Sequence, residues 1–431
     1  MLIANSKVKR TALNLVSVIG GETLLRAANF LAVVVIARLY GAGVLGLYAT
    51  ALAYATVAVM IAENGLQISS ITEIKRTSAD IHGLVSQLWT LRIFLFTVMS
   101  AVLALIGWFS QWPKEVWIIG ILVTVRVLLY SYSQLQFAVL KSIDRMRVIG
   151  PIQTLNFFIL TLGIAATYHY SWNIKLLLWS FIIAQVTEIL LSFRVLWRWG
   201  LRPSKFVMRE CWNLFKRSTP IGMTYVMAGI TMRTDVIVLS ALGSRSDVGH
   251  FAAAHMGVVL FYSLSWLFGS VLLTDFTRLA SNPAEFDGYA NRWTKLLLSV
   301  GGVGALALYF IAPPAVLFLY GEEFAITSRL ASIMILALPL ILLNAVYLSR
   351  AIAIGAKRVY LGTYLGTSIV AITLDVLLAR AYGGVGIAFA IVARELLMFL
   401  IFRTQASVSS RRRILITEPS YTSQVEEAID I

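Results

Sequence analysis

Charged side chains recur inside stretches of sequence that are otherwise apolar, and these are the residues whose types could do chemistry. Five of them are arginines, Arg26, Arg92, Arg126, Arg233 and Arg394, of which Arg394 lies next to Glu395. A charge at the centre of a bilayer costs at least ~2.5–3.5 kcal/mol, so each must face a partner or a water-filled cavity. A guanidinium binds phosphate oxygens through two parallel hydrogen bonds and keeps its proton. Four arginines without an evident acidic partner therefore predict an anionic guest that carries phosphate.

Local spacing leaves alternatives open for two of these arginines. Glu22 and Arg26 are four residues apart and share a helix face with Asn29, so Glu22 could instead pair with Arg26 and hold its helix in register. Arg92 lies with Trp89 on one face, without a local acid, and could reach the cytoplasmic surface by extending its side chain.

Buried carboxylates are the second group of candidates, because they could bind a coupling cation or proton. Arg233 and Asp235 are two residues apart, on different sides of a helix, so they cannot simply neutralise each other. Asp235 aligns with Thr231 and Thr224, a stripe of oxygen ligands that suits a small hard cation or, alternatively, only hydrogen-bonds neighbouring hydroxyls. Glu188 could equally form a salt bridge. The candidate coupling residues are Asp235, Asp375, Glu63 and Glu188.

The elements that carry these residues are predicted to be transmembrane helices. Of 431 residues, 59% are hydrophobic and 13% are charged, whereas globular domains have about 45–50% and about 25%. The apolar runs approach the ~20 residues that a helix needs to cross the hydrocarbon. We predict twelve helices, near 12–37, 44–70, 84–109, 116–140, 148–168, 174–197, 219–242, 249–275, 294–319, 329–354, 360–380 and 385–405.

The placement of positive charge orients these helices. The formal net charge is +15, but Lys and Arg lie in short segments between apolar runs, which is typical of a membrane protein and argues against nucleic acid as a partner. Most of these residues fall on the side of the N-terminus. Six opposite segments hold one each, at Arg38, Lys114, Lys175, Arg245, Arg329 and Arg380. Both termini are therefore predicted to be cytoplasmic.

A long internal loop divides the chain into two sets of six helices. We predict an N-terminal lobe over 1–200, an amphipathic cytoplasmic linker over 201–217, a C-terminal lobe over 218–405 and a cytoplasmic tail over 406–431. The segment Val44–Ala49 opens the second helix of one lobe, and the similar segment Asp247–Ala252 opens the second helix of the other. Two sets of six with matching landmarks favour a two-lobed transporter built from parallel repeats.

Several loose motifs, in order, carry a resemblance to a known group. They are Ala37-Arg38-Leu39-Tyr40-Gly41 through Gly46-Leu47-Tyr48, Glu63-Asn64-Gly65-Leu66, Pro220-Ile221-Gly222, and the run from Arg233-Thr234-Asp235 to Val248-Gly249-His250-Phe251. From about residue 8 to 405 the chain resembles the polysaccharide transporter or oligosaccharide flippase branch of the multidrug/oligosaccharidyl-lipid/polysaccharide exporter superfamily. Tyr40 and His250-Phe251 depart from the usual pattern of that branch.

The resemblance implies an all-α integral membrane protein with two six-helix lobes around a central cleft, in a MATE-like arrangement. It implies a flippase in the bacterial cytoplasmic (inner) membrane that moves polyprenyl-diphosphate-linked oligosaccharides for O-antigen, other lipopolysaccharide, capsule or exopolysaccharide. Membrane lipids, a polysaccharide polymerase and chain-length proteins are the partners that it suggests. In some relatives sodium binds in the second lobe, at positions matching Asp235 and Asp375, so Na⁺ or H⁺ coupling is expected.

Two alternatives differ in cargo or in class. The same fold could export small amphipathic molecules, although cationic drugs would favour an acidic cleft over one rich in arginine. A membrane enzyme such as a glycan polymerase commonly carries a large outward loop, and here every predicted outward loop is short. We therefore expect a transporter rather than an enzyme, without a cofactor beyond the coupling ion.

Overall fold

The protein is helical throughout the part of the chain that the computed structural model describes, which covers residues 2–66, 81–109, 113–143, 145–202, 207–354 and 357–417. No strand occurs in these ranges. Two compact units divide the chain, Met1–Ala253 and Ala254–Ile431, and each is described by itself. The all-α architecture expected from the long apolar runs is confirmed.

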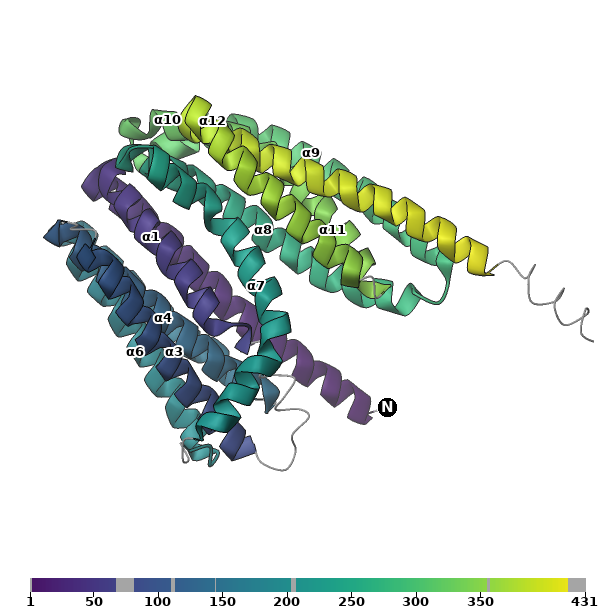
Figure 1. The fold of residues 1–431 in the computed structure, drawn as a ribbon, viewed down its shortest axis with the longest axis horizontal. Helices are drawn as coiled ribbons and strands as arrows, with labels where there is room; N and C mark the ends of the chain where they lie inside the picture. Colours follow the sequence, from purple (N-terminus) through teal and green to yellow (C-terminus); the bar gives the residue numbers. More distant parts are fainter. Residues whose placement is uncertain are drawn as a thin grey trace, which may run out of the picture. The chain divides into compact units, whose positions relative to one another are not determined.

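Unit 1 holds the helices that carry most of the candidate residues. In Figure 1, α3, α4 and α6 run side by side within this unit. α1 packs against α4, α5 and α7, while α6 packs against α4 and α5. The elements are α1 (Leu2–Glu63), α3 (Ile81–Phe109), α4 (Lys114–Ser142), η1 (Met146–Val148), α5 (Ile149–Tyr170), α6 (Ile174–Arg198), α7 (Met208–Leu242) and the start of α8 (Arg245–Leu279).

Unit 2 contains the rest of α8 and the C-terminal helices. α11 packs against both α9 and α12 (Figure 1). The elements are α9 (Pro283–Tyr320), η2 (Glu322–Phe324), α10 (Ala325–Ile335), α11 (Leu338–Ala353) and α12 (Lys357–Thr417). α12 extends beyond the predicted end at residue 405, and residues 418–431 of the predicted tail lie outside the described residues.

Glycine and proline account for where the helices break. The turns predicted at Tyr40-Gly41 and Tyr382-Gly383 are present as bends inside α1 and α12, where Gly41 has φ 75° and Gly383 has φ 59°. Only glycine adopts such angles readily, since it lacks a Cβ atom. The span predicted over 329–354 corresponds to one candidate membrane segment, Glu322–Ala353. A short turn divides it, because α10 ends at Ile335 and α11 begins at Leu338 with Pro339 in its first turn, where a missing N–H is tolerated.

The helices are suited to a membrane. Nine helical segments among the described residues are long and apolar enough to cross one. Two of them, Ile19–Glu63 with 45 residues and Gly366–Gln405 with 40 residues, contain the bends at Gly41 and Gly383 and exceed the length that one crossing needs. The chain is a multi-pass membrane protein, and the count of twelve helices stays a prediction.

The two similar segments of the sequence meet each other inside unit 1. A Cβ atom on Gly46 would overlap the carbonyl oxygen of Arg245, and a Cβ atom on Gly249 would overlap the carbonyl oxygen of Ala42. Each glycine therefore touches the residue four positions before the other glycine. The absence of side chains at both positions lets the second part of α1 and the start of α8 cross in backbone contact.

The predicted amphipathic linker is not separate from the helix that follows. Of its apolar residues, Phe206 lies outside the described residues, and α7 runs without a break from Met208 into the segment predicted to span the membrane. Cys211 is fully buried in a core cluster of unit 1, and Leu214 and Phe215 pack against that cluster. Val207 of the same predicted face is exposed, and an amphipathic linker on the cytoplasmic leaflet stays a prediction.

Candidate anion-binding site in the membrane helices

Arg126 on α4 is the best-defined cation of the membrane-spanning region. Its guanidinium donates hydrogen bonds to Asn29 Oδ1 and to the Tyr48 hydroxyl. It also lies over the ring of Phe181 on α6, 3.8 Å from the centroid. Within the described chain these contacts are neutral oxygens and aromatic rings, and no salt bridge joins Arg126 to a carboxylate. The positive charge is thus oriented and partly buried, but it is not neutralised by the protein.

The bend in α1 creates this arrangement. Asn29 precedes Gly41 and Tyr48 follows it, so Arg126 is bound by both parts of α1. Of the three residues that contact Arg126, only Asn29 was expected near a candidate arginine. Tyr48 was part of a motif, and Phe181 was not predicted. The feature of the sequence that pointed to Tyr48 is its place in one of the two similar segments.

Arg233 on α7 brings a second guanidinium to the same neighbourhood. It is close enough to Arg126, Tyr48 and Asp235 to interact electrostatically with all three. Two like charges repel each other, so their proximity is unfavourable unless an anion reduces the repulsion. Asp235 offsets part of the positive charge, which leaves an excess beside Tyr48.

Arg92 has a different environment from that expected of an arginine without an acidic partner. Its side chain is 0% exposed and forms a 2.6 Å salt bridge with Glu63 Oε1. Arg92 also donates to the Ser131 carbonyl at 2.9 Å, and the Ser131 hydroxyl donates to the same Glu63 oxygen. Because Glu63 comes from another helix, spacing within the Arg92 helix gave no sign of it. This pair joins α1 to α3, and both of its members are buried.

Glu22 and Arg26 lie one helical turn apart on α1, where Glu22 is partly buried and Arg26 is exposed within the unit. Their pairing, and a role of Arg26 beside Arg126 and Arg233, stay predictions.

Glu188 on α6 lies in a cluster of neutral polar groups. It is 1% exposed and accepts a hydrogen bond from the Asn156 amide of α5. Nearby, the Gln185 amide donates to the Ser133 hydroxyl of α4 at 2.8 Å. The salt bridge considered for Glu188 is absent from the described residues.

The two aspartates of the expected sodium site belong to different units. Asp235 is 0% exposed on α7 of unit 1, whereas Asp375 is 1% exposed on α12 of unit 2. The Thr231 hydroxyl, which was expected to align with Asp235, donates to the Met227 carbonyl at 2.9 Å, and the Thr224 side chain lies outside the described residues. A joint cation site at Asp235 and Asp375 stays a prediction.

Unit 2 has a buried ionic cluster of its own. Tyr262 donates to Glu395 Oε1 at 2.6 Å and accepts from Arg394 at 2.9 Å, while the Asn344 amide donates to Glu395 Oε2 at 2.9 Å. The charges at Arg394 and Glu395 are evident in the sequence. Their partners Tyr262 and Asn344 come from other helices, which spacing along one helix does not indicate. The cluster balances its acid with a base and so leaves no excess charge for a ligand.

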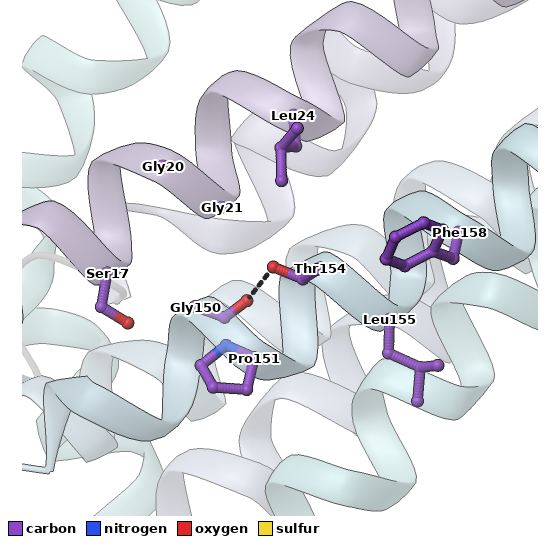
Figure 2. A pocket seen from close by; sticks show the side chains of 9 residues that line it. All are labelled: Ser17, Gly20, Gly21, Leu24, Gly150, Pro151, Thr154, Leu155 and Phe158. Carbon is purple, nitrogen blue, oxygen red and sulfur yellow. Dashed lines mark hydrogen bonds between the residues drawn. The ribbon is translucent and has the colours of Figure 1, made fainter.

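A shallow apolar groove of about 530 Å³ runs between α1 and α5. Figure 2 shows Leu24 on one side and Leu155 and Phe158 on the other, with a hydrogen bond of 2.9 Å from Thr154 to the Gly150 carbonyl. Its lining contains no charged side chain. The groove is suited to a hydrocarbon chain and is separate from the polar contacts of Arg126.

Comparisons with known proteins agree with this architecture. The family model described as "Polysaccharide biosynthesis protein" matches residues 12–274. No curated protein sequence is similar enough to count as a match.

Among solved structures, the lipid II flippase MurJ in an inward closed conformation has a TM-score of 0.70 at 16% identity, covering 93% of this chain and 87% of that one. An inward-facing multidrug resistance MATE family transporter has a TM-score of 0.72 at 12% identity, covering 89% and 95%. A MOP superfamily transporter from Pyrococcus furiosus has a TM-score of 0.63 at 12% identity, covering 93% and 96%. These three proteins are a flippase and two transporters, and the chain shares their fold.

Proposed function

The chain belongs to the family of polysaccharide biosynthesis proteins, and we propose that it is a flippase for polyprenyl-diphosphate-linked oligosaccharides. The cargo would be a repeat unit of a surface polysaccharide such as O-antigen, capsule or exopolysaccharide. The site of action would be the bacterial inner membrane, with both termini in the cytoplasm. A polymerase and chain-length proteins would act on the product.

One observation carries this proposal: two guanidinium groups share a neighbourhood in the membrane-spanning helices, and the contacts of one of them are all neutral. Arg126 is oriented by Asn29 and Tyr48, and Arg233 lies within electrostatic reach of it. A diphosphate supplies negative oxygens that can accept from both arginines, which relieves their repulsion. Such a site favours an anionic head group over a cationic drug.

Alternating access would then move the head group across the membrane, provided that its affinity differs between the two states. The glycan would occupy a polar cleft while the polyprenyl chain stays in lipid. Arg26 and Arg92, also expected at this site, contribute less to the proposal, because Arg92 is neutralised by Glu63. Reset of the empty carrier by a cation or proton at Asp235, Asp375, Glu63 or Glu188 remains part of the proposal.

Binding of a short analogue tests the head-group site. Farnesyl diphosphate, with farnesol as the neutral comparison, can be titrated into the purified protein by calorimetry. A hydrogen bond to a charged group contributes about 1.5–3 kcal/mol, so Arg126→Ala and Arg233→Ala should each weaken farnesyl diphosphate binding by roughly 10- to 150-fold. Arg209→Ala is a matched control, since Arg209 lies on α7 with Arg233 but is exposed.

Two outcomes would contradict the proposal. Farnesol could bind as tightly as farnesyl diphosphate, in which case the arginines do not select phosphate. Alternatively, both arginine variants could bind farnesyl diphosphate with the same affinity as the unchanged protein. Export of a small amphipathic cargo, the alternative function, would be indicated by drug resistance on expression that survives both substitutions.

A further inference from the structure

Glu188 is a buried carboxyl group that has only neutral hydrogen-bond partners among the described residues. Asn156 donates to its Oε2 atom. Its Oε1 atom is buried without a hydrogen-bond partner among the described residues. An ionised carboxylate in such surroundings costs several kcal/mol unless it is paired.

The groups that surround Glu188 are neutral on every helix that packs against α6. On its own helix, Gln185 donates to Ser133 of α4, and Ser192 donates to the Glu188 backbone carbonyl at 2.8 Å. These amides and hydroxyls can exchange hydrogen bonds with a carboxylic acid, which has an O–H donor as well as acceptors. They do not supply a positive charge.

Titratable groups on the neighbouring helices are engaged elsewhere. On α4, Arg126 contacts Asn29 and Tyr48, and Tyr130 is exposed. Other titratable groups on α3, α4, α5 and α6 include Arg92, Tyr132, Lys141, His169 and Arg194. Arg92 is held by Glu63, Tyr132 and Lys141 are partly buried, and His169 and Arg194 are exposed. None of these groups contacts the Glu188 carboxyl in the part of the chain that the structure describes.

Glu63 provides an internal comparison within the same unit. Both glutamates are almost fully buried, but Glu63 has a guanidinium at 2.6 Å and Glu188 has an amide as its hydrogen-bond donor. The same side chain at similar burial thus meets a positive charge in one place and only neutral groups in the other. The Arg92 guanidinium favours the ionised form of Glu63, whereas the neutral groups around Glu188 favour its protonated form.

We propose that Glu188 is a proton-binding site and that its proton drives the transport cycle. Loading adds one proton from water to the carboxylate and removes one negative charge from the interior of unit 1. Release returns that proton to water in a state where the carboxyl is hydrated. The protonation follows from the geometry alone, while the coupling role rests on the proposed function.

Infrared spectroscopy of the whole protein in lipid tests the protonation directly. At pH 7, the spectrum of the unchanged protein minus that of Glu188→Gln should contain the carbonyl band of a carboxylic acid. The matched difference for Glu63→Gln should contain carboxylate bands instead. Glu188→Asp keeps an acid at the position and should keep the carboxylic acid band. This variant therefore controls for a band that disappears only because the glutamine variant misfolds.

Two spectroscopic results would overturn the proposal. Carboxylate bands in the Glu188→Gln difference would show that the group is ionised. Loss of the carboxylic acid band when sodium chloride replaces choline chloride at constant ionic strength would assign the site to sodium rather than a proton.

The coupling role is tested with a fluorescent polyprenyl diphosphate in vesicles of phosphatidylethanolamine and phosphatidylglycerol. A gradient of one pH unit changes the proton concentration tenfold, so it should speed flipping by the unchanged protein by up to tenfold and leave Glu188→Gln unaffected. An equal response of both proteins overturns the coupling role. If the unchanged protein does not flip the probe, the proposed function and the coupling role both fail, and the infrared result still decides the proton site.

Discussion

Glu63→Gln removes one negative charge from a buried pair while keeping the shape of the side chain. Arg92 Nη2 lies 2.6 Å from Glu63 Oε1. At that separation the Coulomb attraction is about 6 kcal/mol for an effective dielectric constant of about 20. The substitution loses this attraction, and Arg92, whose side chain is 0% exposed, remains charged and desolvated. Glutamine and the Ser131 carbonyl still accept hydrogen bonds, which reduces the loss. The expected cost is about 3–5 kcal/mol of unfolding free energy, the range for breaking a buried ion pair.

Chemical unfolding in mixed micelles, followed by tryptophan fluorescence, measures this cost. Glu188→Gln is the control and should change the unfolding free energy by no more than about 1 kcal/mol, because its contacts are neutral. In the double variant Glu63→Gln/Arg92→Gln neither position carries a charge, so its cost should fall below the sum of the single costs by about 1–3 kcal/mol. A Glu63→Gln cost as small as that of Glu188→Gln would refute the account of Arg92 as a structural ion-pair member.

Two further predictions test how the helices pack. Gly46→Ala should destabilise the protein by about 1–3 kcal/mol, because its Cβ atom would overlap a carbonyl oxygen at the start of α8. Gly43→Ala is the control and should be tolerated, because a Cβ atom there meets nothing within 4 Å. Equal losses of stability in thermal unfolding would contradict the close crossing of α1 and α8. Burial and the neighbouring Glu210 carboxylate raise the pKa of the Cys211 thiol, so its alkylation by N-ethylmaleimide should be slow and should require higher pH than that of an exposed thiol. Cys211→Ser/Trp212→Cys supplies the exposed comparison, and equal rates would place the start of α7 on the surface of the protein.

Much of the secondary structure could be predicted, because its signals are local. Run length identified helices, and the bends at Gly41 and Gly383 were predicted from glycine beside an apolar run. The break between α10 and α11 was missed, since Leu336 and Ala337 continue the apolar pattern and Pro339 is tolerated in a first helical turn.

The types of residue in the candidate site could be predicted, but the partner of each charged side chain could not. Helical spacing shows which residues share a face of one helix, but it does not show which helix lies opposite. For that reason neither Arg92 nor Arg126 has an evident acidic partner in the sequence, whereas the structure gives Arg92 the Glu63 carboxylate and gives Arg126 only neutral partners.

The contact between Gly46 and Gly249 bears on how such a chain could have arisen. Gly46 meets the carbonyl four residues before Gly249, and Gly249 meets the carbonyl four residues before Gly46. In a two-fold symmetric contact, a residue i that touches j implies that j touches i, and these two segments obey that relation within one chain. Their sequences are similar, and each begins the second helix of a predicted set of six. The reciprocity agrees with an internal parallel repeat, and the need for backbone contact explains why both segments have glycine there.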